Sequence, residues 1–350
     1  MPCTFSTSSD REGAQIMSAI TGLAHDQRTA RMLLSILAEP DDRVTGRVLS
    51  RVGAIETLRL VDDEDAVPGL NRVEAMMWRD RLALPHRLED VAERMHGMDQ
   101  SGFTVLIPGD EHWPKALADL GDRTPYVLWA RGATSFFARP MEDFVTITGA
   151  RASTSYGQLV AGELAVDLVG AGRVVVAGGA YGIEGAAHRS ALGAGGDTVA
   201  VLAGGVDRPY PAGHRELLDR VADVGLLMSE MPPGATPTRH RFLARGRLLA
   251  ALSEASVIVE AGARSGSLRV AAEAHALGRS VGAVPGPVTS GTSAGPHMLL
   301  RDGRARVVTN ATDVEHLTRR PPEHGIERSE LGPEFSRKQR PSATGQTRSM

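Results

Sequence analysis

Strands and helices are predicted to alternate through residues 144–318, and this alternation constrains the fold more than any other feature of the chain. Short β-branched runs predict strands near 144–148, 173–177, 198–203, 225–229, 256–260, 280–284 and 305–309. Alanine-rich stretches predict helices near 156–170, 183–193, 214–223, 242–254, 267–277 and 311–318. Alternation at this spacing predicts the α/β fold class, with a doubly wound parallel sheet.

Nearly every predicted strand ends in Gly, Ser or Arg. Glycine-rich turns follow the strands within 149–157, 177–188, 260–269, 284–287 and 293–297. In a sheet of this type the carboxyl ends of the strands meet at one edge, and ligands bind there. The sequence therefore predicts a ligand crevice formed by several loops, which is stronger evidence than any single glycine-rich turn.

The rest of the chain divides by composition. Residues 1–25 are expected to be a flexible leader, 26–100 a small all-α domain, 101–320 the α/β domain and 321–350 a disordered tail. Residues 44–58 have the helix–glycine turn–helix pattern of SAM-like and helix-hairpin-helix modules, whose turns can donate backbone N–H groups to phosphate. An ordinary αα-hairpin explains the same pattern.

Charge and cysteine content narrow the functional classes. The net charge is −3, so no global basic field indicates nucleic acid, but residues 236–310 hold ten arginines against four acids. A GC-rich genome is the alternative explanation for these arginines.

Cys3 is the only cysteine, which excludes intrachain disulfides and fits a reducing, cytoplasmic compartment. No secretory signal or charge-free apolar run near 18 residues is present, so we expect no membrane span.

The first two loops are predicted to bind phosphate. Gly149 allows close approach to the backbone, Arg151 supplies a planar donor, and Ser153 or Ser155 is expected to cap the following helix. A plain strand–helix turn with an exposed arginine is the alternative. In the second loop, Gly178, Gly179 and Gly182 form a backbone concavity suited to an anion.

Residues 239–253 are the most informative stretch. Arg239, Arg241, Arg245 and Arg247 are interleaved with Phe242, a pattern suited to a phosphodiester backbone and a stacked base. The alternative is that the start of the helix is solvated and that Phe242 packs into the core. Arginine at a helix N-terminus opposes the helix dipole, which favours the functional interpretation.

A third loop, with Ser265, Gly266 and Ser267, is predicted to join the same binding edge. The chain contains no nucleophile elbow, no carboxylate pair within a motif and no Walker lysine. His188 stands without a cluster of cysteines or carboxylates, so we expect no metal site and no cofactor. These patterns predict a binding protein and not an enzyme.

An ordered set of motifs resembles the DNA-processing protein A (DprA/Smf) family. The matching segments are 149–151, 178–184, 187–188, 198–207, 210–211, 227–232, 242–253, 259–261, 265–267, 278–279 and 284–286. The resemblance covers about 103–310, and the helical segment before it resembles the SAM-like N-terminal domain of the family. It implies an extended Rossmann-like fold and sequence-tolerant binding of single-stranded DNA. It also implies homodimerisation and loading of RecA recombinase onto strands taken up in natural transformation.

By this resemblance, Arg151 and Arg239 would contact phosphate, Phe242 a base, and Arg245 and Arg247 would form the pocket wall. Two alternatives stay open. One is a nucleotide-processing enzyme on a related scaffold, such as a phosphoribohydrolase, although Val270 stands where those enzymes carry a glutamate. The other is a paralogue with a role outside transformation, such as phage defence, which the departures from the family pattern at Tyr181, Leu243 and Gly246 motivate.

Overall fold

The computed structural model describes residues 24–83 and 102–318. Its described part contains one mixed sheet, and the predicted mostly parallel α/β fold is confirmed. The strand order is β1 (Thr104–Leu106), β2 (Leu128–Gly132), β6 (Leu226–Ser229), β5 (Thr198–Val201), β4 (Val174–Gly178), β3 (Phe144–Thr148), β7 (Ala255–Ile258), β8 (Ser280–Ala283) and β9 (Arg306–Val307).

The winding of the sheet reverses between β3 and β7. From β3 the chain proceeds through β4, β5 and β6 on one side, and later through β7, β8 and β9 on the other, with every neighbouring pair parallel. Strand β2 is antiparallel to both β1 and β6. Such a reversal places a crevice at the carboxyl ends of the two strands, where loops leave in opposite directions.

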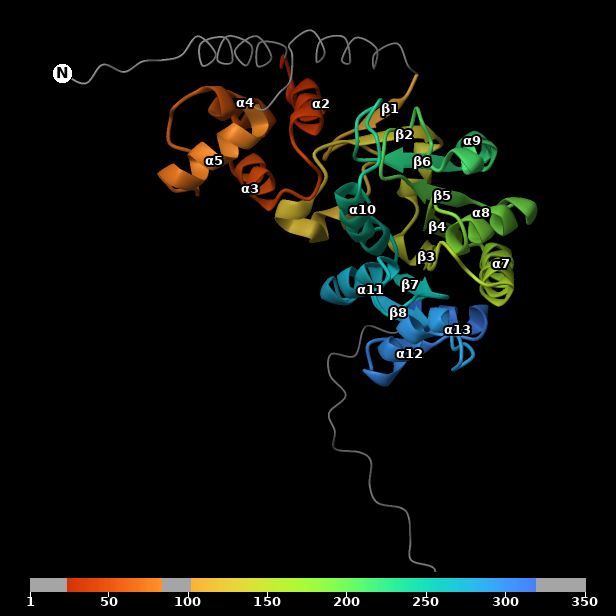
Figure 1. The fold of residues 1–350 in the computed structure, drawn as a ribbon. Coiled ribbons are helices and arrows are strands. Elements are labelled where there is room, and N and C mark those ends of the chain that lie inside the picture. Colours follow the sequence, from red (N-terminus) through yellow and green to blue (C-terminus); the bar gives the residue numbers. More distant parts are fainter. Residues whose placement is uncertain (1–23, 84–101, 319–350) are drawn as a thin grey trace, which may run out of the picture.

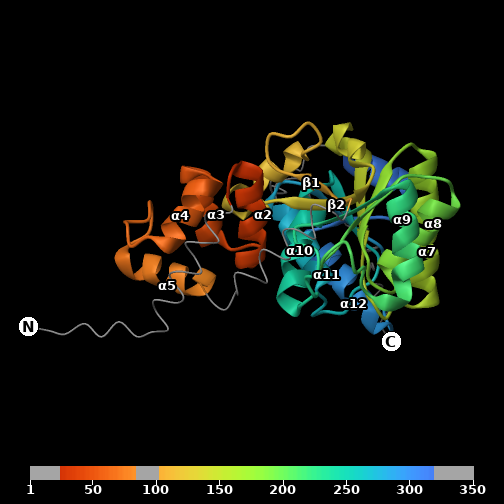
Figure 2. The same cartoon turned by 90° about the horizontal axis from the view of Figure 1, so that it is seen from above.

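Helices cover both faces of the sheet (Figures 1 and 2). One face is covered by α7 (Ser155–Gly170), α8 (Ile183–Gly193), α9 (Arg215–Val224) and α13 (Ala311–Thr318), and the other by α10 (Arg239–Ala251), α11 (Ser267–Ala276) and α12 (Ala294–Arg301). The alternation along β4 shows why. Val174 and Val176 belong to the core under α10 and α11, whereas Val175 belongs to the core under α7 and α8.

Four helices near the N-terminus form a group beside the β1–β2 side of the sheet (Figure 1). They are α2 (Gln27–Leu37), α3 (Arg43–Val52), α4 (Ala54–Asp62) and α5 (Arg72–Ala83). Their apolar core, which includes Leu33, Leu58 and Trp78, continues into Val127 and Trp129. The helical segment and the sheet therefore share one buried cluster.

The α3–α4 connection turns at Gly53, whose φ of 80° suits glycine. The backbone N–H of Ala54 donates to the Gln27 side chain, at 3.0 Å between N and Oε1. At least one donor of this turn is thus used within the protein, which favours the αα-hairpin interpretation of residues 44–58.

Two helices differ from the prediction. Helix α10 begins at Arg239, three residues earlier than expected, because the Thr238 side chain accepts a hydrogen bond from Arg241 N and caps it. Residues 293–297 were expected as a glycine-rich turn, but helix α12 begins at Ala294, and Pro296 is tolerated in its first turn. The predicted leader and tail lie, apart from residues 24 and 25, outside the described residues, as do residues 84–101, so the domain boundaries stay predictions.

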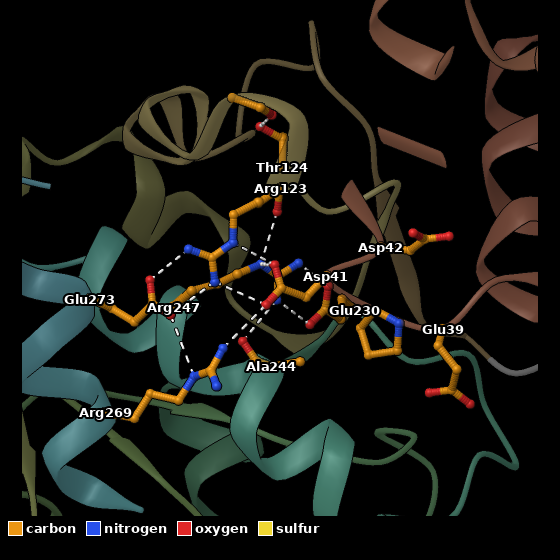
Figure 3. Close-up of polar contacts among 12 residues, drawn as sticks. Glu39, Asp41, Asp42, Arg123, Thr124, Glu230, Ala244, Arg247, Arg269 and Glu273 are labelled. Atoms are coloured by element: carbon orange, nitrogen blue, oxygen red, sulfur yellow. Dashed lines mark hydrogen bonds and ion pairs between the residues drawn. The ribbon is translucent and has the colours of Figure 1, made fainter. Parts of the chain in front are cut away.

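An ion-pair network joins the segment after α2 to helices α10 and α11 (Figure 3). Arg123 holds Asp41 at 2.6 Å and Glu273 at 2.7 Å. Arg247 lies 3.4 Å from Asp41 and donates to both oxygens of Glu230, at 2.7 and 2.6 Å. Only 1 % of the Arg247 side chain is exposed. The network therefore fixes the position of α10 relative to the helical segment.

Removing the Arg247 charge should destabilise the protein. In Arg247→Met, Glu230 keeps a buried carboxylate without its cation, and breaking a buried pair in this way costs about 3–5 kcal/mol. Urea unfolding measures the change. Arg301→Met is the matched control, because Arg301 is 75 % exposed beside Asp302 and its loss should change the free energy of unfolding by less than about 0.5 kcal/mol. Equal unfolding midpoints for the two variants would contradict the proposed contribution of this network to the free energy of unfolding.

Acid should weaken the same network. Burial alone would raise the pKa of Asp41, but hydrogen bonds from Arg123 and the charges of Arg247 and Arg269 outweigh it and hold the pKa below its ordinary value. Hydrogen bonds from Arg123 likewise lower the pKa of Glu273. Both groups therefore add stability that is fully present above their unfolded pKa values, about 4, and is lost as pH falls through the folded-state values.

We therefore expect the free energy of unfolding to fall more steeply below about pH 4 in the wild type than in Asp41→Asn. Urea titrations at stepwise pH measure both profiles. Parallel profiles would show that Asp41 does not carry this pH dependence.

Candidate functional site

A cavity of about 780 Å³ lies at the carboxyl ends of β3 and β7, where the winding of the sheet reverses. Its lining comes from segments far apart in the sequence. Gly149 and Arg151 follow β3, Tyr210 precedes α9, Arg239, Phe242 and Arg245 belong to α10, and Arg264, Ser265, Gly266 and Ser267 lie around the start of α11. Most of the predicted site residues, eight in all, therefore line one cavity.

Phe242 is the aromatic centre of this cavity and is partly buried. The guanidinium carbon of Arg151 lies 4.2 Å from its ring centroid, and that of Arg245 lies 5.4 Å away. The Tyr210 ring meets it edge-on, with 6.0 Å between centroids and 64° between planes. Cations within about 6 Å of an aromatic face are attracted to it, so the ring and the arginines hold one another in place.

Three arginines of the cavity keep their charge available. Arg151, Arg239 and Arg264 are exposed, and within residues 24–83 and 102–318 no carboxylate forms an ion pair with any of them. Arg264 and Tyr210 were not among the predicted binding residues. The sequence signal for Arg264 was its place at the lip of the third loop, and for Tyr210 its place in the segment 210–211 that resembles the family.

Arg245 lies in the cavity lining but is paired. Its Nη2 is 3.2 Å from Glu184 Oε1, and only 10 % of its side chain is exposed. Glu184 also accepts hydrogen bonds from Thr148 Oγ1 at 2.8 Å and from Ala180 N at 3.0 Å. Burial would raise the pKa of Glu184, but the charge of Arg245 and the hydrogen bonds from Ala180 N and Thr148 Oγ1 together outweigh it and keep the pKa lowered, so the pair stays ionised. Arg245 therefore contributes less free charge than predicted.

The second loop was expected to hold phosphate, but Gly178, Gly179 and Gly182 do not line the cavity. The carboxylate of Glu184 takes the Ala180 N–H that an external anion would need. A Cβ at Gly178 would lie 2.3 Å from Arg245 Nη1 and 2.4 Å from Glu184 Oε2. Glycine at this position therefore makes room for the internal ion pair.

The N-terminus of α7, the helix that follows the first loop, is also hydrogen-bonded to groups of the chain itself. Its cap is Thr154, not Ser153 or Ser155, and Glu260 accepts hydrogen bonds from Thr154 N at 2.8 Å and Thr154 Oγ1 at 2.6 Å. The Ser153 hydroxyl does not line the cavity and accepts from Gln158 Nε2 at 3.2 Å. A carboxylate of the chain thus occupies the helix N-terminus that was predicted to bind an anion.

The third loop differs from the first two, because no carboxylate of the described residues occupies it. Ser265, Gly266 and Ser267 line the cavity, and α11 has no side-chain cap at Gly266. The hydroxyls of Ser265 and Ser267 lie 2.8 Å apart. Ser267 N donates to Ser265 Oγ at 3.4 Å, and Leu268 N and Arg269 N donate to backbone carbonyls of the same turn. The start of α11 therefore offers hydroxyl groups to the cavity beside Arg264.

Arg247 was expected in the pocket wall, and this prediction is wrong. The side chain does not line the cavity and is paired with Glu230 in the network of Figure 3. The reason is helical geometry, because residues two apart on a helix point about 200° apart. Arg245 faces the cavity, so Arg247 faces the opposite side of α10.

His188 is a structural residue. Burial lowers its pKa to about 4, so the ring is neutral. Its Nε2–H donates to Gly178 O at 3.0 Å, and Nδ1 lies 2.8 Å from the Thr198 hydroxyl oxygen, which also contacts Val175 O at 2.8 Å. Both ring nitrogens are thus occupied within the core.

Comparisons with known proteins agree on one family. The sequence model of DNA recombination-mediator protein A matches residues 104–319. A DNA processing protein, DprA, of Mycobacterium tuberculosis H37Rv is 49 % identical over 237 residues, which are 65 % of this chain and 60 % of that protein. DprA of Bacillus subtilis 168 is 34 % identical over 215 residues, 61 % of this chain and 71 % of that protein. The chain therefore spans 60 % of the length of its mycobacterial relative.

Solved structures give the same result. The X-ray structure of DNA processing protein A from Streptococcus pneumoniae matches with a TM-score of 0.64 and 28 % identity, over 88 % of this chain and 96 % of that one. A structure from Helicobacter pylori, described for its single-stranded DNA binding mode, matches with a TM-score of 0.55 and 30 % identity, over 61 % of this chain and 94 % of that one.

Gly182 should hold the Arg151 loop, which lines the cavity, in position. Its φ is 77°, and a Cβ there would lie 2.3 Å from Ala150 O and 2.5 Å from Arg151 O. We expect Gly182→Ala to lower the free energy of unfolding by about 1–3 kcal/mol, through backbone strain and displacement of the Arg151 loop. Thermal denaturation measures the loss. Gly262→Ala, also in the cavity lining, has nothing within 4 Å of its new Cβ and should be near neutral. A neutral Gly182→Ala would refute this role.

Proposed function

This chain belongs to the family of DNA recombination-mediator protein A, and on that premise we propose that it binds single-stranded DNA in the cavity and acts as a recombination mediator. One observation carries the proposal. Arg151, Arg239 and Arg264 converge on the cavity that contains Phe242, and none of them is ion-paired within the described part of the chain.

Each residue type has a distinct role in this proposal. The three arginines neutralise backbone phosphates, and the guanidinium group suits phosphate because it is planar and donates two parallel hydrogen bonds. Phe242 and Tyr210 offer rings for base stacking, which tolerates any sequence because every base has a π-face. Ser265 and Ser267 supply hydroxyl donors beside Arg264. Arg239 in the first turn of α10 opposes the helix dipole, a cost that bound phosphate would offset.

The finer parts of the proposal rest on the family. We propose that the protein forms a homodimer in the cytoplasm and loads RecA recombinase onto DNA strands taken up in natural transformation. A paralogue role such as phage defence would use the same cavity chemistry. No helix in residues 24–83 and 102–318 is long and apolar enough to cross a membrane.

The cavity favours binding over nucleotide hydrolysis. Val270 lines it at the position where related phosphoribohydrolases carry a glutamate, and a valine cannot act as a base. The carboxylate of Glu184, also in the lining, is held by Arg245. We therefore propose a non-enzymatic role, and release of free base from nucleoside monophosphates would overturn it.

Removing two of the three arginines should weaken DNA binding. We expect Arg151→Ala combined with Arg239→Ala to lower affinity for an oligothymidylate at least about tenfold, or about 1.4 kcal/mol. Fluorescence anisotropy at several salt concentrations measures both affinity and its salt dependence. The slope of log K against log salt should flatten by about 0.7 for each phosphate that the variant no longer neutralises.

Arg304→Ala serves as the matched control, since it removes one exposed charge outside the cavity. This variant should bind with nearly wild-type affinity. Unchanged binding by the double variant would remove Arg151 and Arg239 from the site, and no salt dependence in the wild type would refute phosphate contact.

A further inference from the structure

Exposed tyrosines and arginines continue the cavity beyond Phe242. We propose that Tyr210, Tyr181, Arg189 and Arg215, here called the aromatic–basic strip, form a second subsite for single-stranded DNA. It would hold the nucleotides adjoining those bound at Phe242. This inference rests on the proposed function and adds to it a path for the strand outside the cavity.

The strip begins at the cavity itself. Tyr210 lines the cavity, and its ring contacts Phe242 edge-on at 6.0 Å between centroids. Yet 49 % of Tyr210 is exposed, so the residue faces both the cavity and the solvent. A base stacked near Phe242 and a base outside the cavity could therefore contact neighbouring rings of the protein.

Tyr181 is held firmly although it is 47 % exposed. Its ring packs against that of His214 at 4.6 Å and 72°, and a Cβ at Gly213 would lie 2.4 Å from the Tyr181 hydroxyl oxygen. Gly179, two residues before Tyr181, connects the two tyrosines, because its carbonyl accepts from His214 Nδ1 at 3.0 Å and a Cβ there would lie 3.1 Å from Tyr210 O. Both rings are thus seated on one packed loop.

The cations of the strip are free to contact phosphate. Arg189 Nη1 donates to His214 Nε2 at 3.4 Å, which positions it beside Tyr181, and Arg215 follows His214 at the start of α9. Both are exposed, and neither forms an ion pair in the described part of the chain. Arg208 is left out because Asp207 lies 3.5 Å from it. Fixed exposed rings beside unpaired arginines are the features of a surface that binds single strands.

Oligonucleotide length separates the strip from the cavity. Anisotropy with oligothymidylates of about 4 to 16 nucleotides should show wild-type affinity rising with length, as the strand reaches the strip. We expect Tyr181→Ala combined with Arg189→Ala to lower affinity for the longest strand at least about fivefold. The same variant should bind the shortest strand as the wild type does. Tyr181→Phe keeps the ring and should retain long-strand affinity.

Each outcome decides the proposal. Equal losses for short and long strands, or no loss for long strands, would overturn the strip while leaving the cavity site standing. No binding of any length by the wild type would overturn the proposed function and the strip with it. Thermal denaturation of the variants checks that they fold.

A second measurement uses only the wild-type protein and so does not depend on folded variants. A fluorescent adenine analogue placed at successive positions of the long strand reports stacking against protein rings. Its emission should change at positions in the cavity and again at the adjoining positions over Tyr181. A response confined to one short stretch would overturn the strip.

Discussion

Pairing of buried charges is the constraint on which this structure depends. A carboxylate or guanidinium removed from water is stable only with a partner in reach. Glu184 takes Arg245, Glu230 takes Arg247, and Glu260 takes the start of α7. Among the arginines that line the cavity, Arg151, Arg239 and Arg264 form no ion pair in the described part of the chain. Internal pairing thus selects which positive charges a ligand can use.

Helix α10 links the helical segment to the cavity because its two faces serve different partners. Arg239, Phe242 and Gly246 follow the i, i+3, i+7 spacing of one helical face and line the cavity. On the other side His240 donates to Pro40 O at 3.1 Å, and Arg241 pairs with Glu39 at 2.6 Å. Together with the Asp41 network (Figure 3), these contacts make the placement of the cavity arginines depend on the segment 39–41.

The sequence was sufficient for the fold and for part of the site. Strand positions followed from β-branched runs, loops at strand ends placed Arg151 and Ser265 near one edge, and the alternation of arginines with an aromatic residue pointed to Phe242. The sequence could not show which arginine is neutralised, because the partners are distant. Glu184 is 61 residues from Arg245, and Glu260 is 106 residues from Thr154. Nor could it show α12, since Gly295 and Pro296 resemble a turn until the helix packs on β8.

The same pairing bears on sequence tolerance in the proposed DNA binding. A site that reads bases needs free donors and acceptors aimed at base edges. In the cavity, the carboxylate of Glu184 is already occupied by Arg245, Thr148 and Ala180. What stays available is guanidinium charge, serine hydroxyls and the rings of Phe242 and Tyr210, with the Phe242 ring shared by Arg151 and Arg245. Phosphates and ring faces are common to every nucleotide, so under the proposed function a cavity of this composition would hold a strand without distinguishing its sequence.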